Sequence, residues 1–217
     1  MSQKTRPHAN SQPPRSPGQA SGSRRAQLRE AMLKDAEKHK RRRWLALVAA
    51  VAVISVVVFG LWSARPTSGE SATAAPDFTL PTTDGQRITL SNLRGGPVVL
   101  YFNEGAGCGS CTAQMAEIEK NPGFKEAGIT VLPIVMNTAE QILPDMQAFG
   151  VTTPYLLDDG TVSKAYNVLG KGMHEGLPGH GFVLIDTEGI QRWYGDYPSM
   201  WLDPDDLLTQ VRSVLKG

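Results

Sequence analysis

The chain has 217 residues, which is enough for one full domain with extensions and short for two. Its net charge of +1 hides an asymmetry, because residues 1–43 hold twelve Lys and Arg against three Asp and Glu, while residues 44–217 hold ten against eighteen. The basic excess is confined to one end of the chain, so the composition indicates a boundary within it and gives no support for nucleic-acid binding.

Residues 1–43 are expected to form a basic, largely disordered tail on the cytoplasmic side of a membrane. Residues 1–27 are rich in Ser, Pro, Gln, Gly and Arg, with almost no large apolar side chain to offset the loss of chain entropy. From Ala26 to Lys40 helix formers dominate, which predicts a short amphipathic helix. Two interpretations of that helix stay open, a contact with anionic lipid and a solvated basic segment.

Residues 44–62 are predicted to be a transmembrane helix. They carry no charge, and as a helix they would span roughly 28 Å, about the thickness of the bilayer hydrocarbon. Trp44 and Trp62 suit the two interfaces, and the basic run 38–43 should stay cytoplasmic. A cleaved signal peptide is the alternative, but the length of the run and the residues before it favour an uncleaved single-pass anchor of a bacterial-type cell membrane.

Residues 63–75 are rich in Ser, Thr, Ala, Pro and Gly and are expected to be a linker, and residues 76–217 are expected to form the folded domain. Apolar runs alternate there with helical patterns. Strands are predicted at 87–90, 98–103, 129–135, 181–186 and 190–194, and helices at 112–120, 138–149, 163–168 and 204–215. Strands separated by helices predict a largely parallel sheet with helices on both faces.

The two cysteines of the chain, Cys108 and Cys111, stand where an apolar strand gives way to a helix. Backbone N–H groups and the positive end of the helix dipole favour a thiolate there, which makes the first cysteine the attacking one. The spacing lets the second sulfur close a disulfide within one turn, so the pair can cycle between dithiol and disulfide.

Several motifs of residues 76–217 together resemble the redoxin branch of the thioredoxin-like superfamily. They are the opening run 75–80, the Asp84-Gly85 turn, the strand that ends at Cys-x-x-Cys and the late run from Phe182 to Gly189. This branch includes the alkyl hydroperoxide reductase/thiol-specific antioxidant family and membrane-anchored thiol–disulfide oxidoreductases. The resemblance implies a thioredoxin-like α/β fold with a mixed central sheet flanked by helices, with Cys108 as nucleophile and Cys111 as resolving cysteine.

The chain departs from that pattern around the cysteines. The family usually has Trp before the first cysteine and Pro before the second, where this chain has Gly107 and Ser110. Gln114 stands where anchored oxidoreductases often have an acid. Glu104 and Glu117 are the nearest carboxylates; we expect ordinary surface charges, with tuning of the pair as the alternative.

The position that faces the cysteines also departs from the family. Thioredoxin-like domains normally place a cis-proline there, and the register against the late strand puts His180 in that position, with Pro178 two residues early and Gly179 between them. His180 is therefore a candidate to stabilise the Cys108 thiolate or to pass its proton. Pro178 is the alternative facing residue if the loop is shifted, and a plain loop histidine is the alternative for His180.

The function favoured by these features is thiol–disulfide exchange with proteins outside the cytoplasm, with a redox donor as second partner and lipid around residues 44–62. This chemistry needs the dithiol and an access groove and implies no cofactor or metal. A thiol peroxidase is one alternative, although Tyr101 and Gly105 fall at the Pro and Thr positions of the peroxide-binding motif of peroxiredoxins. A copper module, for which Cys108 and Cys111 with His174 or His180 would be ligands, is another.

Overall fold

The computed structural model describes residues 17–63, 67–171 and 174–216. It separates into a helical unit that ends at Phe59 and an α/β unit that begins at Gly60. Residues 1–16 of the predicted tail and residues 64–66 of the predicted linker lie outside the described residues. The elements in chain order are α1 (Pro17–Ser63), β1 (Thr67–Ala74), β2 (Thr79–Pro81), β3 (Arg87–Thr89), a 3-10 turn (Leu90–Leu93), β4 (Val98–Phe102), α2 (Gly109–Lys120), α3 (Pro122–Glu126), β5 (Thr130–Val135), α4 (Ala139–Phe149), β6 (Leu156–Leu157), α5 (Thr161–Ala165), β7 (Gly181–Ile185), β8 (Ile190–Asp196) and α6 (Pro204–Lys216).

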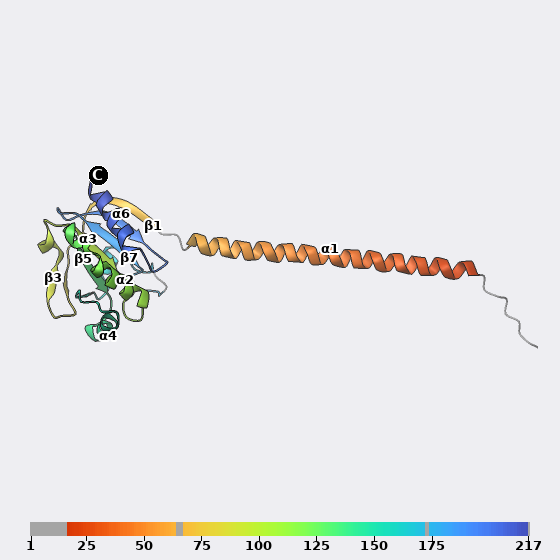
Figure 1. The fold of residues 1–217 in the computed structure, drawn as a ribbon, viewed down its shortest axis with the longest axis horizontal. Helices are drawn as coiled ribbons and strands as arrows, with labels where there is room; N and C mark the ends of the chain where they lie inside the picture. Colours follow the sequence, from red (N-terminus) through yellow and green to blue (C-terminus); the bar gives the residue numbers. More distant parts are fainter. Residues whose placement is uncertain (1–16, 64–66, 172–173, 217) are drawn as a thin grey trace, which may run out of the picture. The chain divides into compact units, whose positions relative to one another are not determined.

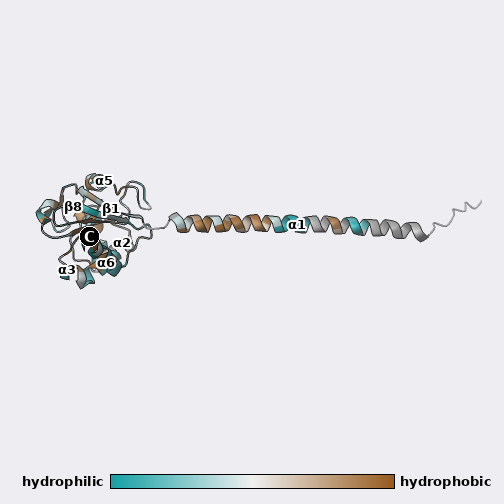
Figure 2. Ribbon diagram, turned by 90° about the horizontal axis from the view of Figure 1, so that it is seen from above, coloured by the Kyte–Doolittle hydropathy of each residue, from teal (hydrophilic) through white to brown (hydrophobic). Residues whose placement is uncertain are grey.

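Helix α1 is continuous from Pro17 to Ser63, so the prediction of disorder up to residue 27 and of a separate short helix was wrong for these residues. Once a long apolar helix exists, each further residue extends it without a new nucleation cost, which offsets the poor helix propensity of the tail. The stretch Lys38–Trp62 is long and apolar enough to cross a membrane, and its side chains are exposed. Figure 2 shows the hydrophobic residues gathered along the C-terminal part of α1.

The central sheet has six strands in the order β1-β8-β7-β4-β5-β6. Strands β1, β5 and β7 of this sheet are labelled in Figure 1. The β4–β5 and β5–β6 pairs are parallel, and the β4–β7, β7–β8 and β1–β8 pairs are antiparallel. The mixed sheet implied by the resemblance is therefore confirmed, and the largely parallel sheet predicted from the alternation was wrong. The tight turn between β7 and β8 makes a hairpin, and a hairpin pairs its strands antiparallel.

Strand β1 occupies residues that the composition assigned to a linker. It pairs antiparallel with β8 at the edge of the sheet, from Thr67 opposite Asp196 to Ala74 opposite Ile190. Its side chains are almost all exposed, so no alternation of apolar and polar residues marks it in the sequence. The ladder hydrogen bonds to β8, rather than buried side chains, hold this strand in place.

Side chains of the central strands alternate between the two faces of the sheet and build two hydrophobic clusters. On one face Val99, Tyr101 and Phe182 pack with residues of α2, α3, α4 and α6. On the other face Leu100 and Val183 pack with residues of the β2–β3 hairpin and α5. Every residue of β4 and β7 is buried, which fixes the end of β4, and the loop that follows it, relative to α2.

Candidate functional site

Cys108 and Cys111 are joined in a disulfide at the start of α2, with their Cα atoms 5.3 Å apart. Cys108 is the N-cap residue of the helix, and the Cys111 N–H lies 3.3 Å from its sulfur. Cys108 is partly exposed, whereas Cys111 is fully buried. The position between strand and helix is as the sequence predicted. Solvent reaches Cys108, whose attacking role stays a prediction.

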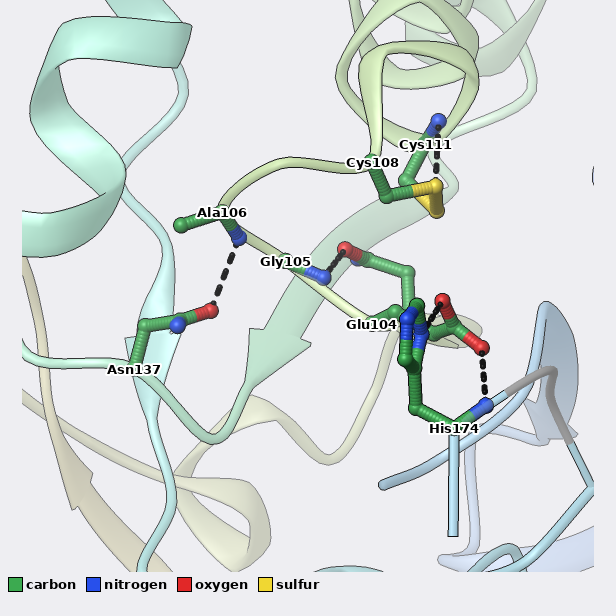
Figure 3. A network of polar contacts seen from close by, with 8 residues as sticks. Glu104, Gly105, Ala106, Cys108, Cys111, Asn137 and His174 are labelled. Carbon is green, nitrogen blue, oxygen red and sulfur yellow. Dashed lines mark hydrogen bonds and ion pairs between the residues drawn. A yellow bond between two sulfur atoms is a disulfide. The ribbon is translucent and has the colours of Figure 1, made fainter.

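The loop between β4 and Cys108 is fixed by acceptors that the protein itself supplies. Four consecutive backbone N–H groups, those of residues 105–108, each donate a hydrogen bond within the chain. Figure 3 shows two of these bonds, those donated by Gly105 and Ala106. The acceptors are Asn103 Oδ1 at 3.0 Å from Gly105 N, Asn137 Oδ1 at 2.9 Å from Ala106 N, Asp145 Oδ2 at 2.8 Å from Gly107 N and Gly105 O at 3.0 Å from Cys108 N. The loop is thus held rigid although it lacks proline.

Two glycines of this loop adopt a left-handed backbone, with φ of 77° at Gly105 and 89° at Gly107. A Cβ atom on Gly105 would collide with the side chain of Asn137, whereas a Cβ on Gly107 would meet open space. Gly105 is therefore required by its backbone and by its neighbour, and Gly107 by its backbone alone. The left-handed backbone explains why a bulky residue such as Trp does not precede Cys108.

Helix α4 borders the motif from the side. Its Asp145 carboxylate holds the Gly107 N–H, and the ring of Phe149, one turn later, packs against Gly109. Phe149 is 41% exposed, so an aromatic surface lies beside the cysteines although none is present in the motif itself. Neither residue was recognised from the sequence, because both lie more than thirty residues after Cys108 and no local pattern links the two segments.

His180 is buried immediately before β7, with 1% of its surface exposed. The Tyr101 hydroxyl lies 3.1 Å from its Nδ1 and 3.4 Å from its Nε2, and the same hydroxyl donates to the backbone oxygen of Cys111 at 3.1 Å. His180 Nε2 also lies 3.4 Å from Gln114 Oε1. The structure thus connects His180 to the second cysteine through Tyr101, a residue that the sequence did not single out for this role.

Burial controls the protonation of this group. Loss of hydration lowers the pKa of His180 to about 4, so the ring is neutral at pH 7 in the disulfide form. Burial likewise raises the pKa of Tyr101 well above its ordinary value and keeps the phenol protonated. Both groups are therefore uncharged beneath the disulfide.

Pro178 and Gly179 are buried in the segment that leads into His180. Pro178 forms a bridge with Leu169, and the residues that the structure describes contain no cis peptide bond. Gly107, by contrast, is exposed beside Cys108. A role for Pro178 or Gly179 in facing the dithiol or binding substrate stays a prediction.

The two nearby glutamates differ in their environments. Glu117 is an exposed charge paired with Lys120 at 2.7 Å, as expected. Glu104 is 4% exposed, and its carboxylate lies 2.7 Å from Nδ1 of the exposed His174 (Figure 3), so the expectation of a surface charge was wrong for this residue. It stands two residues after the end of the buried strand β4.

Among the residues that the structure describes, no group of three or more His, Cys, Asp and Glu side chains is placed to hold a metal ion. His174 contacts Glu104, and His180 contacts Tyr101. Both histidines that the copper alternative requires thus contact other side chains of the chain.

Comparisons with known proteins agree with the fold. The family model of the AhpC/TSA family matches residues 72–194. A Mycobacterium tuberculosis protein named "Putative peroxiredoxin" is 33% identical over 131 residues, which are 58% of this chain and 82% of that protein. The solution structure of a "putative protein disulfide isomerase" from Bacteroides thetaiotaomicron is similar with a TM-score of 0.53 and 30% identity, over 70% of this chain and 95% of the other. The crystal structure of the peroxidoxin BcpB from M. tuberculosis is similar in fold, with a TM-score of 0.55 and 21% identity over 68% and 96% of the two chains.

Proposed function

This chain belongs to the AhpC/TSA family and is an oxidoreductase, and we propose that it is a membrane-anchored thiol–disulfide oxidoreductase acting on proteins outside the cytoplasm. The observation that carries the proposal is the asymmetry of the pair, because Cys108 is open to solvent at the start of α2 and Cys111 is buried next to it. Attack on another protein needs an accessible first sulfur, and release needs a second sulfur that only the first can reach.

The reaction follows from this geometry. The Cys108 thiolate attacks one sulfur of a client disulfide, a new bond joins Cys108 to the client, and the other client sulfur leaves as a thiolate. The Cys111 thiolate then attacks the Cys108 sulfur, which closes the pair and releases the second client thiol. The client gains two electrons that the pair loses, and a dithiol donor restores the pair; run in reverse, the same steps oxidise a client dithiol.

Three groups assist the attacking sulfur in this proposal. The N-terminus of α2 stabilises the negative charge of the thiolate. The loop fixed by Asn137 and Asp145 keeps Cys108 in one position without reorganisation at each cycle. His180, through Tyr101, is the titratable group beneath the pair.

The proposed location rests on α1. The stretch Lys38–Trp62 has the length and composition of a membrane span, and six consecutive residues from Lys38 to Arg43 include five cations at its N-terminal end. Cations at one end of a span favour the cytoplasmic side, so residues 67–217 would lie on the opposite side. In that compartment a dithiol pair meets proteins that contain disulfides.

Trapping of the mixed disulfide tests the chemistry. We expect Cys111→Ser in the full chain, kept in detergent and reduced beforehand, to accumulate a covalent complex with an unrelated disulfide-containing protein such as insulin. Cys108→Ser is the matched control, because it retains a cysteine but removes the exposed one. Absence of a complex with Cys111→Ser, or an equal yield with Cys108→Ser, would refute the proposed reaction.

Thiol labelling tests the location. Intact bacterial cells that produce the full chain are treated with a reductant and then with a membrane-impermeant maleimide. Labelling of Cys108 is expected without cell lysis, while a cytoplasmic protein with a surface cysteine stays unlabelled. Labelling only after lysis would place the domain on the cytoplasmic side and contradict the proposed orientation.

A thiol peroxidase is the second candidate, favoured by the peroxiredoxin relative that is 33% identical. Around Cys108, however, the loop N–H groups already bind Asn103, Asn137 and Asp145, and Gly105 cannot carry a side chain without displacing Asn137. Stopped-flow oxidation of the reduced chain by hydrogen peroxide separates the two functions. A rate near that of a free thiol supports the exchange function, and a rate higher by three orders of magnitude or more supports the peroxidase.

A further inference from the structure

A row of buried polar atoms next to Cys111 makes more hydrogen-bond contacts than its neutral side chains have protons to donate. It runs from the Cys111 backbone oxygen to the Tyr101 hydroxyl, then to His180, then to Gln114 Oε1. These are three contacts, and each needs one proton between its two heavy atoms. The Cys111 oxygen and Gln114 Oε1 are acceptors only, so the row ends in an acceptor on both sides.

The orientation of Gln114 is fixed by a separate bond. The backbone N–H of Leu202 donates to Gln114 Oε1 at 2.8 Å, so the oxygen, not the amide nitrogen, faces His180. The amide nitrogen itself is buried and has no hydrogen-bond partner among the described residues. A flipped amide would lose the Leu202 bond, and the acceptor at this end of the row is therefore retained.

Neutral Tyr101 and neutral His180 supply two protons for the three contacts. With the proton of His180 on Nδ1, the Gln114 oxygen faces a lone pair on Nε2. With the proton on Nε2, the single Tyr101 proton has to serve both Cys111 and Nδ1. An imidazolium supplies the missing proton, and only in that form does each contact of the row hold one.

The other groups around His180 carry no fixed charge that decides its protonation. The ring packs against Tyr101 and Phe182, and its backbone oxygen accepts the N–H of Tyr197, whose phenol has a pKa raised by burial. The acid Asp196 lies opposite Gly181 on β8; burial raises the pKa of its carboxyl, and Lys171 acts against that shift. The cysteine pair is then the neighbouring group that changes charge with redox state.

We propose that reduction of the disulfide adds one proton to this row, so that the negative charge of a Cys108 thiolate is compensated by the positive charge of a His180 imidazolium. A dithiol donor supplies two electrons, and the sulfur–sulfur bond breaks. Of two protons that come from the donor and the solvent, one binds to Cys111 and the other to His180. On oxidation both protons leave. This deepens the proposed function and rests on it, because it assigns the proton that accompanies each exchange.

Burial opposes the imidazolium while the pair is a disulfide, which agrees with the pKa of about 4 in that state. A thiolate at the start of α2 adds a negative charge on the far side of Tyr101, and an opposite charge nearby favours the protonated ring. We expect the His180 ring, which is neutral at pH 7 in the disulfide form, to be protonated at pH 7 in the dithiol form.

Nitrogen NMR of the histidine rings tests this shift directly. The full chain is labelled with ¹⁵N-histidine, kept in detergent and recorded at pH 7 before and after reduction; His180→Asn identifies the signal by its loss. We expect a neutral ring in the oxidised protein and two protonated ring nitrogens in the reduced one. His174→Asn is the matched control, since that ring is exposed and contacts Glu104. A neutral His180 in both states would overturn the proposal.

Two variants test the row itself. Tyr101→Phe removes the hydroxyl that links His180 to Cys111, and we expect the redox-dependent shift of the His180 pKa to fall to less than half. Gln114→Glu places a carboxylate beside Nε2, and we expect a protonated ring in the oxidised form as well. If His180 titrates in these variants as in the unmodified chain, the row does not control the proton. Trapping of the mixed disulfide by Cys111→Ser is measured separately, so failure of the proton uptake remains distinguishable from failure of thiol–disulfide exchange.

Discussion

The hydroxyl of Tyr101 donates a hydrogen bond to the backbone oxygen of Cys111 at 3.1 Å, which ties the centre of the sheet to the first turn of α2. Both residues are fully buried, so no water can replace this bond. Because Tyr101 belongs to β4, the register of this strand in the sheet fixes the position of Cys111.

Tyr101→Phe should lower the free energy of unfolding by about 1–3 kcal/mol, because the ring still packs against Phe182 while the buried contacts of the hydroxyl with Cys111 and His180 are lost. Urea denaturation of the oxidised chain measures this change. An unchanged midpoint would mean that the bond contributes nothing to stability, and a loss above about 3 kcal/mol would point to disrupted packing instead.

The oxidised protein should lose stability as the pH falls from about 6.5 to about 4. The pKa of His180 is lowered by burial to about 4, so in this window the unfolded chain binds a proton that the folded chain does not, and unfolding becomes easier as the pH falls. The full difference amounts to about 3 kcal/mol. His180→Asn should flatten the pH dependence of the denaturation midpoint; equal curves for His180→Asn and the unmodified chain would contradict the assignment.

Gly105 and Gly107 form a matched pair, since both have a positive φ but only Gly105 is packed against a neighbour. Gly107→Ala should cost about 1 kcal/mol for the backbone alone. Gly105→Ala should cost about 2–4 kcal/mol, because Asn137 must also move and give up the Ala106 N–H. Thermal or chemical denaturation of the two variants checks the order, and a larger loss for Gly107→Ala would show that the collision with Asn137 is relieved at no cost.

Asp145 places a negative charge next to Cys108, through its bond to the Gly107 N–H. Asp145→Asn keeps an acceptor for that N–H and removes the charge, so the Cys108 thiolate should become easier to form and its pKa should fall by a few tenths of a unit, an effect that shrinks in high salt. Thiolate absorbance at 240 nm in the reduced chain follows the titration. Asp145→Ala is the comparison that also removes the acceptor, and a rise of the pKa in Asp145→Asn would exclude a mainly electrostatic role.

Local signals in the sequence were sufficient for the elements that carry the cysteines. Strand β4 is a continuous apolar run, the Cys-x-x-Cys spacing marks the start of α2, and the register of the late strand placed His180 immediately before β7. These features depend on neighbours within a few residues or on a family pattern, and the structure reproduces them.

The contacts that surround the motif could not be found in this way. The loop is contacted by three polar residues from segments distant in the chain, Asn137, Asp145 and His174. No local sequence pattern distinguishes them from other polar residues. Strand β1 was missed for a related reason, because its exposed side chains carry no pattern and the partner that holds it is β8. Long-range pairing, not local preference, decides these positions.

The pairing of β1 with β8 also sets an order of events during synthesis. Thr67 and its partner Asp196 are separated by more than a hundred residues, so β1 leaves the ribosome long before the strand that it needs. Contacts of such separation form late and slowly, because a long stretch of chain must first be closed into a loop. The segment that follows the apolar helix therefore stays unpaired with its partner strand until β8 is complete.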